Sequence, residues 1–276
     1  FSIYGFGLAV APIVGPTVGG WITDTFSWHW IFFINVPIGI ISLLLVWLFV
    51  HDAEEEREAH TKNRQKSKTI DWAGIFLFVA GIATLEIVLK NGPKEGWFES
   101  GYIITLTTFA FLSLLIGVTW EWYRKDPAVD IEMFRHRHFT GAFVLTFIVG
   151  AVSWGSTFLI PYFAQTLLKY NATNAGMVLM PGAIVLMIMI PIVGILIDKI
   201  DARKIILFGL LGSAAAMWNF SSLNLEVDFY GLAQARVFQS FSIAFLAVSI
   251  NTAAYYNIPP EKNNNASSLL NLSRNV

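Results

Sequence analysis

Residues 175–197 read AGMVLMPGAIVLMIMIPIVGILI, an apolar run without a charged side chain. A helix rises about 1.5 Å per residue, so about 20 apolar residues match a hydrocarbon core about 30 Å thick. Seven similar runs fill most of the remaining chain: Phe1–Ile22, Trp30–Val50, Trp72–Leu89, Ile103–Trp122, Phe139–Leu168, Ile205–Leu223 and Phe229–Tyr255. Lipid offers the backbone no hydrogen-bond partners, and the alternating strands of a barrel are absent from the sequence. The sequence therefore predicts an all-α polytopic membrane protein with about eight transmembrane helices.

Composition agrees with this class, because 55% of the residues are hydrophobic and only 13% are charged. No segment between the apolar runs is long enough for a large soluble domain. The absence of cysteine excludes disulfides and thiolate metal sites. The chain starts with Phe1 inside an apolar run and stops at Val276 after what reads as the entry to a further helix, so we expect an internal piece of a longer protein.

Lys and Arg are concentrated in alternate loops, which marks the cytoplasmic side. Fourteen of the 18 basic residues lie in one set of loops: Arg57, Lys62, Arg64, Lys66, Lys68, Arg124, Lys125, Arg135, Arg137, Lys199, Arg203, Lys204, Lys262 and Arg274. The opposite loops carry only Lys90, Lys94 and Lys169. The first helix is therefore expected to run from the cytoplasm to the exterior. The two longest loops, at 51–71 and 123–138, are both expected to be cytoplasmic. They divide the chain into residues 1–50, a helix pair at 72–122, and residues 139–276.

A Gly-Pro-x-x-Gly-Gly motif, Gly15, Pro16, Gly19 and Gly20, lies near the outer end of the first apolar run. Proline removes a backbone donor and bends a helix, and glycine lets neighbouring helices approach closely. Ordinary helix packing uses the same residue types. The order of the motif, followed by the run WHWIFFINVPIG at 28–39, is more specific.

At these residues the chain resembles the EmrB/QacA-type drug:proton antiporters, the fourteen-span branch of the major facilitator superfamily. The resemblance implies that Gly15–Gly20 is the antiporter motif of the fifth family helix and that the chain carries helices five to twelve and the start of thirteen. Residues 1–50 would then be the last two helices of the N-terminal bundle. Residues 72–122 would be the inserted helix pair, and 139–276 would be part of the C-terminal bundle.

A second motif of this superfamily runs from Gly194 through Asp198 and Lys199 to Arg203 and Lys204. One position departs from the family pattern, because Asp201 replaces a glycine. The acid and the paired basic residues could form a latch that closes the cytoplasmic side in one conformation. The alternative is a short turn that needs only basic residues.

Two ionisable residues within spans are candidates for a proton or substrate site, because charges there are costly. Glu86 could carry a proton, or form an ordinary pair with Lys90 one turn further on. Arg236, with Gln239 nearby, could face a central cavity and meet an anionic substrate or a carboxylate. It could instead extend its long stem to the outer interface.

Trp154, Phe158 and Tyr162 repeat every four residues and so share one helix face. Contact with lipid or a neighbouring helix is one interpretation, and an aromatic wall for hydrophobic drugs is the other. Asp24, just beyond the Gly-Pro motif, is expected to be a helix-end group rather than a proton carrier.

The sequence contains no hydrolase, zinc-protease or phosphate-loop motif, and nothing in it indicates an enzyme, a cofactor or a nucleic-acid partner. The resemblance implies a multi-pass protein of the bacterial inner membrane that exports hydrophobic or amphipathic toxic compounds against proton entry by alternating access. It also implies a periplasmic adaptor and an outer-membrane channel as partners. A major facilitator exporter or importer of one metabolite, and a membrane sensor or scaffold, remain as alternatives.

Overall fold

The computed structural model describes residues 2–49, 71–124, 129–256, 258–259 and 262–275, with side chains described from residue 14 onward. Within these ranges every regular element is helical, which confirms the all-α class. The chain divides into two units, 1–50 with 138–276, and 51–137. The predicted loop at 51–71 lies almost entirely outside the described residues.

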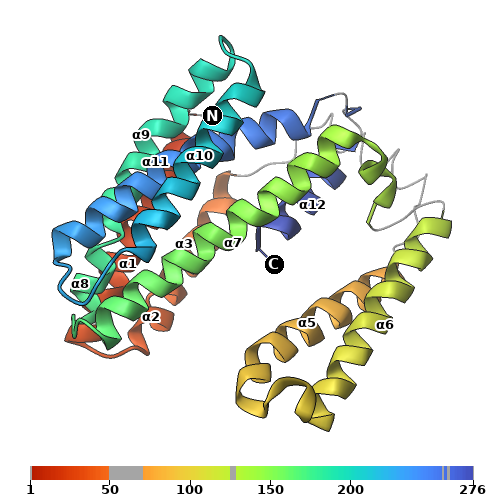
Figure 1. The fold of residues 1–276 in the computed structure, drawn as a ribbon, viewed down its shortest axis with the longest axis horizontal. Helices are drawn as coiled ribbons and strands as arrows, with labels where there is room; N and C mark the ends of the chain where they lie inside the picture. Colours follow the sequence, from red (N-terminus) through yellow and green to blue (C-terminus); the bar gives the residue numbers. More distant parts are fainter. Residues whose placement is uncertain (1, 50–70, 125–128, 257, 260–261, 276) are drawn as a thin grey trace. The chain divides into compact units, whose positions relative to one another are not determined.

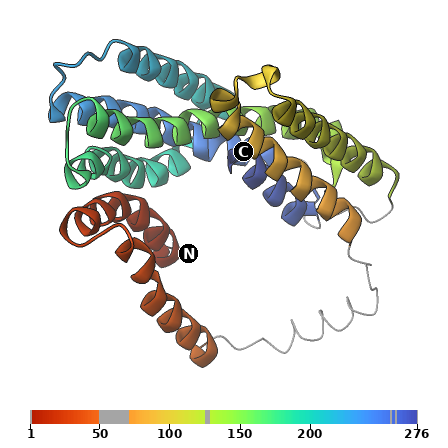
Figure 2. The same ribbon diagram turned by 90° about the horizontal axis from the view of Figure 1, so that it is seen from below.

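The first unit holds most of the long helices (Figure 1). In chain order they are α1 (Ser2–Thr25), α2 (Trp30–Phe33), α3 (Asn35–Phe49), α7 (Arg137–Thr166), α8 (Ala172–Met177), α9 (Met180–Ile197), α10 (Ala202–Ser221), α11 (Phe229–Ala254) and α12 (Asn263–Asn275). Helix α11 packs along both α9 and α10, and α1 packs against α8 and α9 (Figure 2).

The second unit is a hairpin of α5 (Trp72–Glu95) and α6 (Gly101–Tyr123), with short 3₁₀ turns η1 (Trp97–Glu99) and η2 (Ile131–Arg135). Helix α5 runs past the predicted end at Leu89 and through Pro93. It stops at Gly96, which has φ +71°, a left-handed conformation suited to glycine.

Seven segments of the described chain are long and apolar enough to cross a membrane. They are Trp30–Phe49, Trp72–Glu95, Gly101–Tyr123, Arg137–Thr166, Ala172–Ile197, Ala202–Ser221 and Phe229–Ala254. The eighth predicted span coincides with α1, whose side chains from Ser2 to Ile13 lie outside the description. The prediction of a polytopic membrane protein is confirmed.

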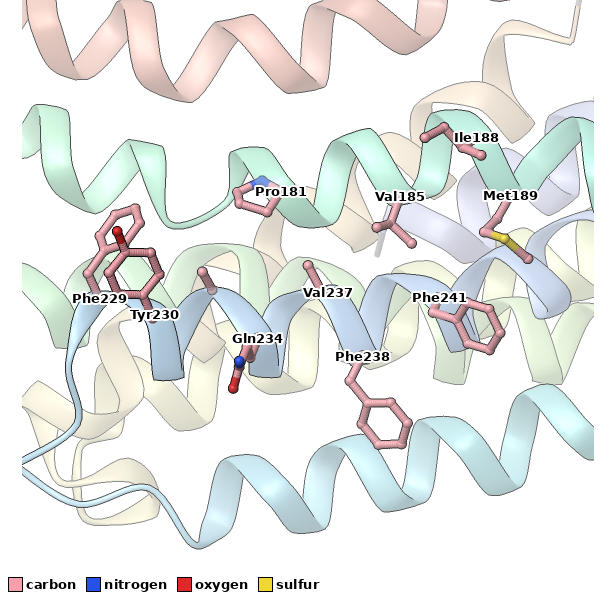
Figure 3. Close-up of a pocket in the computed structure, with 11 residues that line it drawn as sticks. Pro181, Val185, Ile188, Met189, Phe229, Tyr230, Gln234, Val237, Phe238 and Phe241 are labelled. Carbon is pink, nitrogen blue, oxygen red and sulfur yellow. The ribbon is translucent and has the colours of Figure 1, made fainter.

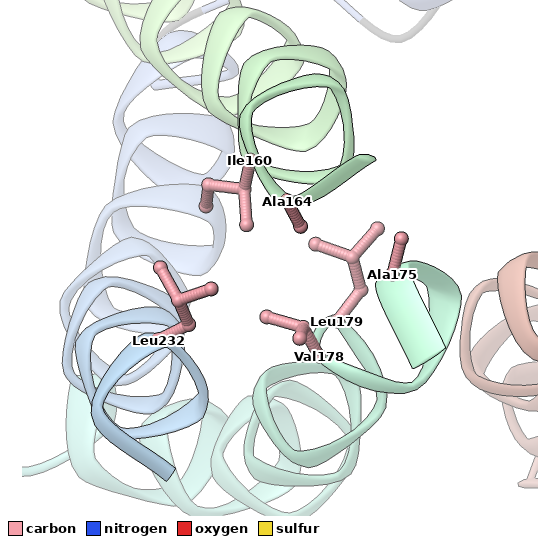
Figure 4. Close-up of a cluster of buried hydrophobic side chains, with 6 residues drawn as sticks. All are labelled: Ile160, Ala164, Ala175, Val178, Leu179 and Leu232. Carbon is pink, nitrogen blue, oxygen red and sulfur yellow. The ribbon is translucent and has the colours of Figure 1, made fainter. Parts of the chain in front are cut away.

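Apolar side chains of α7, α8 and α11 meet in one buried cluster (Figure 4). Its members are Ile160, Ala164, Ala175, Val178, Leu179 and Leu232. In lipid the hydrophobic effect does not drive helices together, so close van der Waals packing must, and small side chains such as those of Ala164 and Ala175 allow it. This cluster fixes the relative positions of the helices that carry the candidate site.

Candidate functional site

The Gly-Pro motif of α1 forms a tight junction with α8. A Cβ atom on Gly20 would overlap the backbone carbonyl of Ala172, and one on Gly176 would overlap that of Pro16. Gly15 and Gly19 have no neighbouring atoms within 4 Å of a built Cβ position. Of the motif's glycines, Gly20 is therefore the one that this contact requires.

Asp24 closes the same junction at the end of α1. Its carboxylate accepts hydrogen bonds from Ala172 N (3.1 Å), Thr173 N (2.7 Å) and Thr173 Oγ1 (2.6 Å). Asn171 Oδ1 accepts from Asn174 N (2.9 Å), so the first three backbone N–H groups of α8 are all bonded. The hydrogen bonds from Thr173, side chain first, hold the pKa of Asp24 below its usual value, so the carboxylate is charged at neutral pH.

A second polar contact joins α7 to α11 inside the spans. Arg236 Nη1 donates to Ser156 Oγ (2.9 Å) and to Gln239 Oε1, and Nη2 donates to Thr157 Oγ1 (2.7 Å). Gln239 Nε2 also donates to Ser156 Oγ (2.7 Å). We call Arg236, Gln239, Ser156 and Thr157 the α7–α11 cluster.

This cluster is buried, since Arg236 is 8% exposed and Gln239 is 0% exposed. A guanidinium that bonds to α7 in this way is not extended to the membrane interface, so the snorkelling interpretation does not fit. Helix α9 approaches closely at Gly182, where a Cβ would lie 2.7 Å from Arg236 Cγ.

An apolar cavity of about 370 Å³ lies between α7, α10 and α11 next to this cluster. Gly155, Leu159 and Ile160 form its α7 wall, and side chains of α10 and Leu232 of α11 complete it. Ser156 is the only hydrogen-bonding side chain in the lining. The cavity therefore reaches the α7–α11 cluster through a single hydroxyl group.

A larger apolar pocket of about 680 Å³ follows the other face of α11, against α9 (Figure 3). Pro181, Val185 and Met189 line its α9 side, and Tyr230 and Gln234 of α11 are the residues with polar side chains in its lining. No charged side chain lines it. It is an apolar surface without the buried cation of the α7–α11 cluster.

The second motif forms the turn between α9 and α10. Asp198, Lys199, Arg203 and Lys204 are exposed, and in the described part of the chain none of them forms an ion pair. Asp201, the departure from the family glycine, begins α10: its Oδ1 accepts from Arg203 N (2.9 Å). Gly194 has no neighbour within 4 Å of a built Cβ position.

Two other candidates lie on exposed helix faces. Glu86 is exposed on α5 and forms no ion pair with Lys90 in the described structure, so this alternative for Glu86 does not fit. Trp154 is 58% exposed, and with Phe158 and Tyr162 it lies outside the linings of both pockets. Phe158 and Tyr162 stack on each other with ring centroids 6.1 Å apart.

The second unit carries its own buried carboxylate, Asp71, at the start of α5. It accepts from Gly74 N (3.0 Å) and Trp120 Nε1 (3.1 Å) and forms an ion pair with Arg124 (3.1 Å). The hydrogen bond from Gly74, then that from Trp120 and the charge of Arg124, lower the pKa of Asp71. This set of contacts ties the two helix ends together and is structural in character.

Sequence reasoning missed several partners. Ser156 and Thr157 contact Arg236 from about 80 positions away, and Ser and Thr in membrane helices are too common to single out. Glu121, buried on α6 beside Gly74, was also missed, although its place in an apolar run was a usable signal.

The long apolar helices, the glycine junction and the buried polar cluster together describe a multi-helix membrane protein. The model of the Major Facilitator Superfamily matches residues 1–276, so the chain belongs to that superfamily and is not an enzyme. It is a multi-pass protein of the bacterial inner membrane.

The chain is 33% identical to the Multidrug export protein EmrB of Escherichia coli (strain K12) over 276 residues, which is 100% of this chain and 52% of that protein. It is 31% identical to the Fatty acid resistance protein FarB of Neisseria gonorrhoeae over 254 residues, 91% of this chain and 48% of that protein. These similarities confirm the resemblance to EmrB-type drug exporters. The chain spans about half the length of the curated relatives it matches.

Proposed function

We propose that the native protein is a proton-coupled exporter of hydrophobic or amphipathic toxic compounds that works by alternating access. The observation that carries the proposal is the apolar cavity between α7, α10 and α11, with Ser156 at its wall and Arg236 directly behind. Ligand sites are commonly apolar cavities of about 300–1,000 Å³ with a few polar groups that orient the ligand. A mostly apolar lining also suits broad selectivity.

The α1–α8 junction supports a moving part in this transporter. The topology from basic residues puts Asp24 and the start of α8 on the exterior side, so the junction would close the outer end of the molecule. The exposed charges of Asp198, Arg203 and Lys204 would close the cytoplasmic end when α1 and α8 separate. Such an exchange of closed ends is the basis of alternating access.

The names of the relatives, multidrug export and fatty acid resistance, agree with apolar substrates. We extend the proposal to a periplasmic adaptor and an outer-membrane channel, for which the family resemblance is the support. Co-purification of an adaptor with the native protein from mildly solubilised membranes is the direct check of that partner.

Export is tested in everted membrane vesicles that contain the native protein. We expect dye accumulation that depends on a proton gradient, and a substrate-dependent pH change. Pro16→Leu and Asp198→Asn should each reduce drug tolerance of cells, whereas Glu86→Gln tests whether an exposed carboxyl on α5 contributes to proton coupling. Transport of one metabolite without any drug would favour the alternative of a specific transporter, and absence of all transport would contradict the proposal.

A further inference from the structure

Arg236 is the only charged side chain away from the helix ends in α7, α9, α10 and α11. The acidic residues described in the first unit are all at helix ends or in loops: Asp24, Asp198, Asp201, Glu226 and Asp228. None of them forms an ion pair with Arg236. Among the residues that the structure describes, the positive charge is therefore buried against neutral groups, an expensive arrangement that membrane proteins retain for function.

The neutral partners do not use all the hydrogen-bonding capacity of the guanidinium, which has five N–H groups. Nη1 donates twice and Nη2 once. Nε is buried without a hydrogen-bond partner among the described residues. Hydroxyl and amide dipoles can bond to a cation, but only an anion neutralises it.

Access to this charge from the apolar cavity is controlled by Ser156. Arg236 Nη1 and Gln239 Nε2 converge on Ser156 Oγ from 2.9 and 2.7 Å. Rotation of this small side chain about χ1 would present both donors to the cavity. A carboxylate oxygen of a ligand in the cavity would accept the same two hydrogen bonds and would also supply the missing negative charge.

We propose that Arg236 and Gln239 recognise the anionic group of the substrate, so that the cavity takes apolar compounds that carry a carboxylate or a similar acid. The apolar body lies against α7 and α10, and the acid replaces Ser156 as the acceptor of the two donors. This inference rests on the proposed export function and specifies the substrate class of the same site.

The test uses three probes with one tricyclic body: anthracene carboxylic acid, anthracene carboxamide and aminomethylanthracene. Uptake into energised everted vesicles is compared for the native protein, Arg236→Gln and Arg236→Lys, with protein-free vesicles as the blank. A charged hydrogen bond is lost in Arg236→Gln, so we expect uptake of the acid to fall about tenfold or more. Uptake of the carboxamide should change less than about twofold, and Arg236→Lys should retain most of the acid uptake.

The carboxamide measured on the same variant reports whether the protein still folds and transports. Equal loss of acid and carboxamide in Arg236→Gln would overturn the inference, because it would make Arg236 a partner of the protein's own carboxylate or of the fold. A native protein that prefers the carboxamide or the amine would also overturn it, while export itself would stand. A native protein that moves neither these probes nor other drugs would instead refute the proposed export function.

Discussion

The α1–α8 junction and the α7–α11 cluster are two interhelical contacts of the same unit, and they differ in how completely their polar groups are matched. At the junction, Asp24 and Asn171 bond the first three N–H groups of α8, although the Thr17 hydroxyl has no hydrogen-bond partner among the side chains that the structure describes. At the cluster, the buried Nε of Arg236 has no hydrogen-bond partner among the described residues, and neither do the buried hydroxyls of Ser153 on α7 and Ser240 on α11.

The difference indicates what each contact does. A contact whose backbones touch and whose helix-start N–H groups are all hydrogen-bonded is suited to hold two helices in one arrangement. A buried cation with spare donors beside a cavity is suited to bind something else. We therefore expect the α1–α8 junction to stabilise one conformation and the α7–α11 cluster to bind a ligand.

Among the substitutions considered, Gly20→Ala in α1 should destabilise the α1–α8 junction most strongly. Gly20→Ala places a Cβ against the backbone of Ala172, whereas Gly19→Ala meets open space one position earlier. We expect Gly20→Ala to cost about 1–3 kcal/mol of the closed arrangement, as overpacking commonly does. Drug export and the thermal unfolding temperature in detergent measure the effect.

Gly19→Ala is the matched control, because it makes the same chemical change on the same helix. If the two variants behave alike, the close approach of α1 to α8 does not limit function. The α1–α8 junction would then not be a contact that stabilises one conformation of the protein.

Asp24→Asn should weaken the same junction by about 1 kcal/mol, since it replaces a charged acceptor with a neutral one at a helix start. The lowered pKa of Asp24 also makes a pH prediction. Its stabilising contribution is full above the ordinary carboxyl pKa of about 4 and is lost as the pH falls through the lowered value.

The measurement is the difference in unfolding temperature between native protein and Asp24→Asn across the acidic range. Asp71 also has a lowered pKa, so the wild-type curve alone does not isolate Asp24. The difference should shrink as the pH falls. A difference that stays constant with pH would show that the charge of Asp24 does not matter.

The predictable part of this molecule is the part that depends on local composition. Apolar run lengths identify the spans, because lipid demands a helix wherever the run is long enough. The break between α8 and α9 inside one such run was not predicted, since the whole run is apolar and gives no local signal. Gly96 was a visible stop for α5, but the apolar criterion ended that helix at Leu89.

For the candidate site, the sequence could identify individual residues but not the contacts between them. Arg236 stood out because a charge in a span is rare, and Gly20 because it belongs to a motif. Their partners depend on tertiary contacts: Asp24 was recognised as a helix-end group, but the helix it caps begins 148 positions later. No local pattern can reveal that a carboxylate serves a different helix.

Substitution of Asp201 shows how much stability a carboxylate contributes when it only caps a helix. Asp201 caps the start of α10 as Asp24 caps the start of α8, but Asp201 belongs to the turn directly before its own helix and joins no second helix. Asp201→Ala should therefore cost about 0.5–1 kcal/mol of stability, and Asp201→Asn almost nothing because asparagine caps equally well. If Asp24→Asn costs no more than Asp201→Asn in the same unfolding assay, Asp24 contributes nothing beyond a local cap.

Arg236→Met should change the stability of the α7–α11 cluster little, and this distinguishes the cluster from the α1–α8 junction. Methionine keeps much of the apolar stem and removes an uncompensated buried charge, and replacing buried charges by apolar residues is often neutral or stabilising. Thr157 and Ser156 keep hydrogen bonds to the Ser153 carbonyl, so their hydroxyls are not left without partners. We expect the unfolding free energy to stay within about 1 kcal/mol of the native value. The unfolding measurement is made without substrate, so a charge that serves only to bind substrate should contribute little to it. A loss of about 3 kcal/mol or more would instead show that Arg236, like Asp24, holds helices together.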